Sequence, residues 1–130
     1  MKYPDYFPKG CPPKEANQIE HIVYRICKNK EVSHSDFLSF YEMGLLPNSN
    51  DVKKYGISLD LNKEQLVAML GMPAQKKRNM KCVAEGITKK ELGVSLKTPS
   101  ARSSSHITWW LKSGATPEDY FKCVFVKGDN

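Results

Sequence analysis

Two adjacent tryptophans, Trp109 and Trp110, constrain the fold of this chain more than any other feature. They lie in the segment His106–Leu111, whose β-branched and aromatic residues predict a β-strand. Neighbouring side chains of a strand point to opposite faces of a sheet, so the two indoles are expected in different environments. The set predicted to face the core is wholly apolar: Ile107, Trp109 and Leu111. The other set is amphiphilic and is predicted to be partly exposed: His106, Thr108 and Trp110.

This amphiphilic face is the first candidate site. An imidazole suits general acid–base catalysis because its unperturbed pKa is about 6.5, so His106 is a candidate catalytic residue. An indole can stack on a planar ring, and hydroxyls or a guanidinium can bind a phosphate. The candidate ligand-binding residues here are Thr108, Trp110, Arg102 and Ser105. The alternative is that His106 caps a loop and Trp110 covers a sheet edge, with no ligand involved.

Arg25 is the second candidate catalytic residue, because it interrupts the apolar run Val23–Cys27. An unpaired buried charge is costly, so an arginine in a buried strand needs a partner. That partner is either structural, with Asp60 or Glu85 as the candidates, or a ligand phosphate held by two hydrogen bonds.

A weaker signal is Ser58, a hydroxyl that follows Gly56 in another predicted strand, which we include as a ligand-binding candidate. Each of Arg25, Ser58 and His106 is predicted to lie on a strand, and none has an obvious local partner. We therefore expect the three side chains to line one concavity.

Positive charge is concentrated in one part of the chain. Residues 76–102 contain eight basic and two acidic residues, so they hold the whole formal net charge of +6. Clustered charge attracts anions, which predicts a phosphate-bearing ligand, either a nucleotide or a nucleic acid. Lys76, Lys77 and Arg78 are the candidate anion-binding residues, and a solvated surface loop is the alternative.

The order of strand and helix signals predicts an α+β fold, in a single domain with a mixed or mostly antiparallel sheet and short interleaved helices. Helix starts are indicated at Ser33, Asn62 and Thr116, and one helical turn is indicated between Thr88 and Gly93. The strands are expected in Ile19–Lys28, Tyr55–Leu61, Lys81–Glu85, Val94–Leu96, His106–Leu111 and Phe121–Lys127. Residues 1–18, with four prolines, are expected to form an extended arm on the single domain of residues 19–130.

Several classes of protein are disfavoured by the sequence. No apolar run approaches the roughly 20 residues needed to cross a bilayer, and no signal peptide is present. We therefore expect a cytoplasmic protein that does not associate with a membrane. The four cysteines are widely spaced, which argues against a zinc site and a disulfide framework, and three of them are expected in the core. No Walker loop, G-x-S-x-G elbow or H-E-x-x-H motif occurs.

Five short motifs resemble those of a family of small bacterial proteins. The shared pattern is C-P-P…V-Y-R-x-x-K-N…D-F-L-S…G-x-S…S-H-x-T-W-W, which begins here at Cys11 and ends at Trp110. The match spans almost the whole chain and its last motif is specific. This resemblance implies a bacterial protein and brings no activity with it.

A looser resemblance is to the ADP-ribosyltransferase superfamily, in which an arginine on the first strand precedes a G-x-S strand that leads into a helix. That resemblance implies NAD as a cofactor, with Arg25 on its phosphates and Ser58 in the nicotinamide pocket. The glutamate-bearing strand of the superfamily is missing, and Glu85 is the only nearby substitute. The RNA 2′-phosphotransferases, which rely on arginine and histidine, fit equally well.

Two functions follow from these patterns. The first is a site for a nucleotide or nucleic acid, as in an NAD- or RNA-phosphate-directed transferase. The second is a non-catalytic protein-interaction module, such as an accessory or neutralising partner in a defence or toxin system, with the His106–Trp110 strand as its contact surface. Phosphate binding weakens steeply with salt and an aromatic protein interface does not, so salt dependence distinguishes the two.

Overall fold

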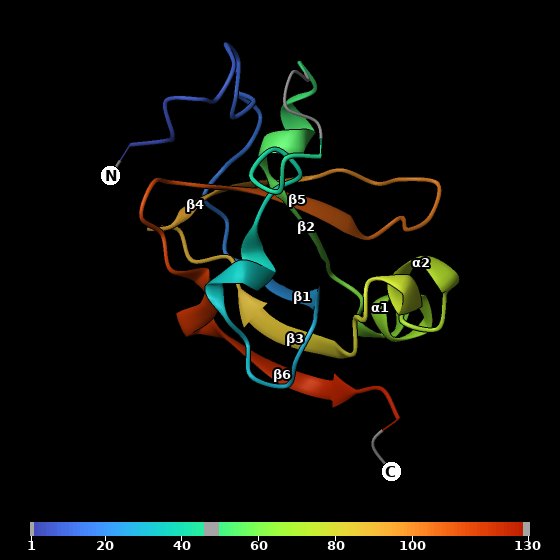
Figure 1. The fold of residues 1–130 in the computed structure, drawn as a ribbon. Coiled ribbons are helices and arrows are strands. Elements are labelled where there is room, and N and C mark those ends of the chain that lie inside the picture. The colour runs from blue at the N-terminus through green and yellow to red at the C-terminus, as the bar shows by residue number, and fades with distance from the viewer. Residues whose placement is uncertain (1, 46–49, 129–130) are drawn as a thin grey trace.

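The computed structural model describes residues 2–45 and 50–128. In this part of the chain, short helices lie between some of the strands along the sequence (Figure 1). The strands are β1 (Ile22–Cys27), β2 (Ile57–Asp60), β3 (Cys82–Ile87), β4 (Gly93–Lys97), β5 (His106–Leu111) and β6 (Phe121–Val126). The helices are the 3₁₀-helices η1 (His34–Phe37), η2 (Val52–Tyr55) and η3 (Pro117–Tyr120), and the α-helices α1 (Lys63–Met69) and α2 (Pro73–Lys77).

The strands form one six-stranded sheet in the order β4-β5-β2-β1-β3-β6. Every ladder among the described residues is antiparallel, so the mostly antiparallel form of the prediction is confirmed and the mixed form is not. The helices are few and short, so the fold is dominated by the sheet.

The cap signals in the sequence mark real helix starts. Ser33 and Asp36 form a capping box at η1, and the side chain of Asn62 accepts a hydrogen bond from the backbone N–H of Glu64 at the start of α1. The helix that follows Ser33 is confined to the four residues of η1.

A turn lies between Thr88 and Gly93 as predicted, since the backbone N–H of Leu92 donates a hydrogen bond of 3.0 Å to the carbonyl oxygen of Lys89. Thr88 does not open it as a cap. The hydroxyl of Thr88 accepts a hydrogen bond of 2.8 Å from the backbone N–H of His21. This bond joins the residue that follows β3 to the residue that precedes β1. Gly93 begins β4 because the backbone of β5 lies against it: a Cβ atom there would be 2.0 Å from the carbonyl oxygen of Trp110.

Apolar side chains cover both faces of the sheet. The larger cluster includes Val23, Leu59 and Trp109, and is covered by Phe37 of η1. Cys27 and Cys82 belong to it and Cys123 packs against it, as expected for core cysteines. The smaller cluster joins Leu66 and Leu70, at α1, to the other face of β3.

Both tryptophans of β5 are fully buried. The core position of Trp109 is confirmed, whereas the expected partial exposure of Trp110 is wrong, since each side chain is 0% exposed. The indole N–H of Trp110 donates a hydrogen bond of 2.9 Å to the carbonyl oxygen of Val52. Strand alternation places the two indoles on opposite faces as predicted, but η2 lies against the indole of Trp110 and keeps it from solvent.

The N-terminal segment packs on the sheet edge and on the loop after η1. Asn17 forms an isolated antiparallel bridge with Ser95 of β4. The rings of Tyr6 and Tyr41 stack with their centroids 4.5 Å apart, and Tyr55 lies 4.9 Å from Tyr41. Within the described residues, no helix has the length and apolar character that a membrane span requires.

Candidate functional site

The candidate site lies where the sheet opens between β1 and β2. β1 pairs with β3 along its whole length, and β2 pairs with β5 likewise. Between β1 and β2, however, the only register pair is Tyr24 with Asp60. The two strands separate beyond this pair, so backbone groups on their facing edges need other partners.

Arg25 supplies one of these partners. Its Nη1 donates a hydrogen bond of 2.7 Å to the carbonyl oxygen of Ser58, and its Nε donates one of 2.9 Å to the carbonyl oxygen of Asp36. The guanidinium therefore spans the opening and joins β1 to β2 and to η1. Burial, with a smaller effect from the nearby Arg78, lowers the pKa of Arg25.

The carboxylate partners expected for Arg25 are engaged elsewhere. Asp60 accepts hydrogen bonds from Ser103 and Ser105, which lie in the serine loop before β5. Glu85 accepts a hydrogen bond of 3.1 Å from the hydroxyl of Tyr24. Among the described residues, no carboxylate lies within 4.0 Å of the Arg25 guanidinium. The direct partners of Arg25 are thus two carbonyl groups, and the carboxylate of Asp36 acts on its charge only electrostatically, in the direction that raises its pKa.

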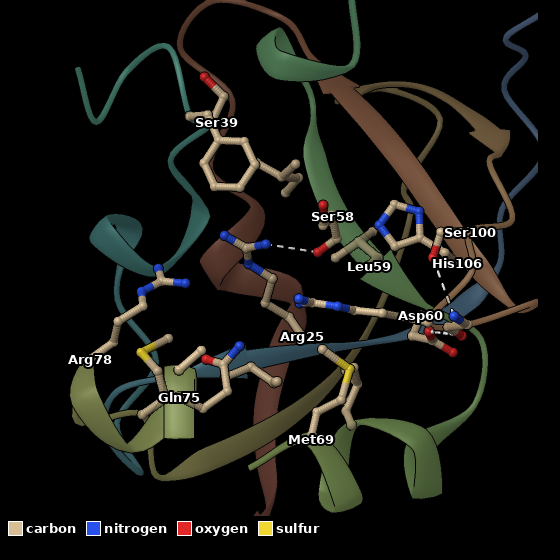
Figure 2. A pocket seen from close by; sticks show the side chains of 18 of the residues that line it. Arg25, Ser39, Ser58, Leu59, Asp60, Met69, Gln75, Arg78, Ser100 and His106 are labelled. Carbon is tan, nitrogen blue, oxygen red and sulfur yellow. Dashed lines mark hydrogen bonds between the residues drawn. The ribbon is translucent and has the colours of Figure 1, made fainter. Parts of the chain in front are cut away.

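A cavity of about 350 Å³ fills the opening. Strand alternation places Arg25 and His106 on opposite faces of a continuous sheet, yet both line this cavity because the sheet is not continuous here. Figure 2 shows Arg25, Arg78, Ser58 and His106 arranged around the same space. Its polar lining consists of Arg25, Arg78, Arg102, His106, Ser39, Ser58, Ser100, Ser103, Asp60 and Gln75.

Asp60 is the only carboxylate in that lining, and its oxygens are already occupied. Its two oxygens accept hydrogen bonds of 2.6 Å from Ser105 and from Ser103, and one also accepts a bond of 2.8 Å from the backbone N–H of Asn62. The side chain is 1% exposed. The serine loop therefore serves to hold a buried carboxylate, which the sequence analysis did not include among the site residues.

Ser105, expected to bind a ligand, is committed to Asp60 and is absent from the cavity lining. Thr108 and Trp110, also expected to bind a ligand, are 2% and 0% exposed, and neither lines the cavity. Thr108 instead shares a hydrogen bond of 2.7 Å with the hydroxyl of Thr98.

His106 is half-buried on the cavity wall, and one edge of its ring is fixed. Its Nδ1 lies 3.1 Å from the carbonyl oxygen of Thr98 and 2.8 Å from the hydroxyl oxygen of the same residue. Burial lowers the pKa of His106, against smaller opposite effects from the Thr98 backbone and from Asp60.

The basic cluster of the sequence is divided in space. Arg78 and Arg102 line the cavity, whereas the exposed Lys76 and Lys77 do not. Farther along, Lys89 pairs with Glu20 at 3.6 Å. Two of the three residues predicted to bind an anion therefore lie outside the cavity, and Arg25 from a distant strand lines it instead.

The apolar part of the lining was missed by the sequence analysis. It combines the loop after η1 with the region around α1, and its side chains are Ile26, Leu38, Phe40, Met43, Ile57, Leu59, Leu66, Met69, Ala74 and Met80. Unbranched methionine side chains adapt readily to a ligand's shape. No spacing in the sequence links Met43 to Met69, because only the fold brings them together.

Comparison of the chain with protein-family models, curated proteins and solved structures gave no match. The function is therefore inferred from the geometry of the cavity.

Proposed function

We propose that the cavity between β1 and β2 binds a small phosphate-bearing ligand of nucleotide size. One observation carries the proposal: Arg25, Arg78 and Arg102 line one cavity, and none forms an ion pair within the described residues. Guanidinium groups bind phosphate through parallel N–H donors, and clustered charge in a concave site strengthens the attraction.

The shape and chemistry of the cavity support a small ligand rather than a polymer. Its volume of about 350 Å³ lies at the lower end of the roughly 300–1,000 Å³ of small-molecule pockets. The apolar part of the lining, which includes Met43, Met69 and Met80, suits a flat or apolar body attached to the phosphate. The exposed Lys76 and Lys77 lie outside the lining.

Transfer chemistry on NAD or on an RNA phosphate is the finer form of this proposal. It is supported by the contact of Arg25 with Ser58 and by the presence of His106 beside them. The glutamate of the ADP-ribosyltransferase superfamily has no counterpart in the cavity. Glu85, the only nearby substitute, accepts a hydrogen bond from Tyr24 and does not line the cavity.

Titration calorimetry with inorganic phosphate, AMP and NAD tests the binding proposal. Charge-assisted hydrogen bonds contribute about 1.5–3 kcal/mol each, so R78Q and R102Q should each weaken binding by roughly 10-fold or more. The matched control is the double variant K76Q/K77Q, which removes two nearby charges outside the cavity and should change the affinity little. Wild-type protein that binds none of the three at about 20 mM salt, where screening is weak, would refute the proposal.

A protein-interaction function has a specific observation in its favour, but not at the strand first expected. The interior residues of β5, from Ile107 to Trp110, are buried and cannot form a contact surface. Exposed apolar side chains occur instead on β1, β3 and η3, where Ile22 pairs with Ile87 and Tyr120 is 44% exposed. If this second candidate holds, I22S should abolish association with a protein partner and leave phosphate binding unchanged.

A further inference from the structure

The hydrogen bonds of His106 fix which ring nitrogen carries the proton. A carbonyl oxygen only accepts hydrogen bonds, so the 3.1 Å contact between Nδ1 and the Thr98 carbonyl requires a proton on Nδ1. The Thr98 hydroxyl at 2.8 Å can accept from the same N–H while donating to Thr108. In the neutral ring, Nε2 then carries the lone pair.

Nε2 is open to the cavity. Among the described residues it has no hydrogen-bond partner, and it is not one of their buried unpaired polar atoms. His106 lines the cavity together with Arg78 and Arg102. An acceptor atom is thus placed in a site whose other free polar groups are mainly donors.

Burial keeps this acceptor available near neutral pH. It lowers the pKa of the imidazole against smaller opposite effects from the Thr98 backbone and from Asp60, and Lys53 and Arg25 lower the pKa slightly further. The ring is therefore mainly neutral at pH 7, below which its protonation would remove the lone pair.

We propose that His106 Nε2 accepts a hydrogen bond from a hydroxyl of the bound ligand, and that the site is specific for phosphate esters carrying a free sugar hydroxyl. This inference rests on the proposed phosphate site and adds the ligand's second recognition group. The phosphate is held by the arginines, and the hydroxyl is held by Nε2. Thr98 is the positioning residue, because its carbonyl and hydroxyl orient the ring.

Two substitutions separate the two ring nitrogens. In H106N, the amide reaches the position of Nδ1 and keeps a donor for the Thr98 carbonyl, while the acceptor at Nε2 is lost. In H106Q, the longer amide places an oxygen near the position of Nε2. H106N thus lacks the acceptor at the Nε2 position and H106Q retains one, while both side chains are uncharged amides of similar polarity.

The experiment compares AMP with its 2′,3′-dideoxy analogue by titration calorimetry at pH 7.5, and uses inorganic phosphate as the probe of the arginines alone. A net hydrogen bond corresponds to roughly a 2- to 12-fold difference in affinity, so wild type should prefer AMP by about that factor. H106N should lose the preference and H106Q should keep part of it. R78Q should weaken both ligands equally.

Nitrogen-15 NMR of the free protein reads the tautomer independently of any ligand. A proton on Nδ1 supports the inference, and a proton on Nε2 at pH 7.5 overturns it. Equal binding of both nucleotides by wild type also overturns it, while binding of inorganic phosphate that depends on Arg78 would leave the proposed function standing. If phosphate itself fails to bind, the proposed function fails first and the hydroxyl contact falls with it.

Discussion

Arg25 Nη1 donates a hydrogen bond of 2.7 Å to the carbonyl oxygen of Ser58, across the gap where β1 and β2 have parted. This side chain thus replaces ladder bonds that the backbone does not make. The same guanidinium lines the cavity without a carboxylate partner among the described residues. A structural role and a ligand-facing role, which the sequence posed as alternatives for Arg25, are therefore compatible.

Removing the guanidinium should destabilise the fold. In R25M, the carbonyl groups of Ser58 and Asp36 lose their donors, and each unsatisfied group costs about 1–3 kcal/mol when water cannot replace the bond. We expect a loss at the lower end of this range for each group, because the site is only half-buried. Urea unfolding measures it. R102M is the control, since Arg102 is exposed, and a loss in R102M equal to that of R25M would contradict the bridging role.

The two tryptophans should be similarly important for stability. Both are 0% exposed, so W109A and W110A should each lower the free energy of unfolding by about 3–5 kcal/mol. Phenylalanine variants separate the indole nitrogens. W110F loses the bond to Val52, while Trp109 Nε1 has no partner in the described part of the chain. W110F should therefore lower the free energy of unfolding by about 0.5–1.5 kcal/mol more than W109F, as measured by chemical denaturation.

Glycine substitutions test the close approach of β4 to β5. G93A places its Cβ 2.0 Å from a backbone oxygen of Trp110, so the strands must move apart, at a cost of about 1–3 kcal/mol or more. At Gly71 the nearest atom would be 3.4 Å away, so G71A should be neutral or stabilise by up to about 1 kcal/mol. Thermal unfolding of the two variants should show opposite or clearly unequal shifts.

Acid should weaken the fold through its buried histidines. Burial lowers the pKa of His106, and burial with Lys97 nearby lowers that of His21. The unfolded chain then takes up protons first, so this stability is complete above about pH 6.5 and is lost as the pH falls through the folded-state values. The free energy of unfolding should fall between pH 7 and 5. The decline should be shallower in H106N and in H21N, and an unchanged slope in both would refute the assignment.

Strand positions followed from local composition, whereas the covering of each face did not. The β-branched and aromatic residues of β1 and β5 indicated their strands, and cap residues such as Asn62 marked helix starts. The environment of Trp110 could not be predicted, because alternation tells which face a side chain takes and not which segment lies over it. η2 contacts Trp110 through the backbone carbonyl of Val52, and a backbone contact of this kind is not encoded in the pattern of side chains.

The site was predictable only in part for a similar reason. Arg25, Ser58 and His106 stand out as polar residues on strands, and they do meet in one cavity. Their meeting depends on the loss of pairing between β1 and β2, which no single residue encodes. Asp60 was missed as a site residue because its role comes from serines more than 40 residues away in sequence.

The single pair of Tyr24 with Asp60 also has a mechanical consequence. It divides the sheet into two three-stranded blocks, β4-β5-β2 and β1-β3-β6. That pair and one guanidinium link the facing edges of the blocks, while the larger apolar cluster packs across both. Backbone amides along the seam should exchange with deuterium sooner than those inside either block. A ligand bound between β1 and β2 would contact both blocks and hold them together. Ligand binding should therefore slow the hydrogen exchange of backbone amides in both blocks.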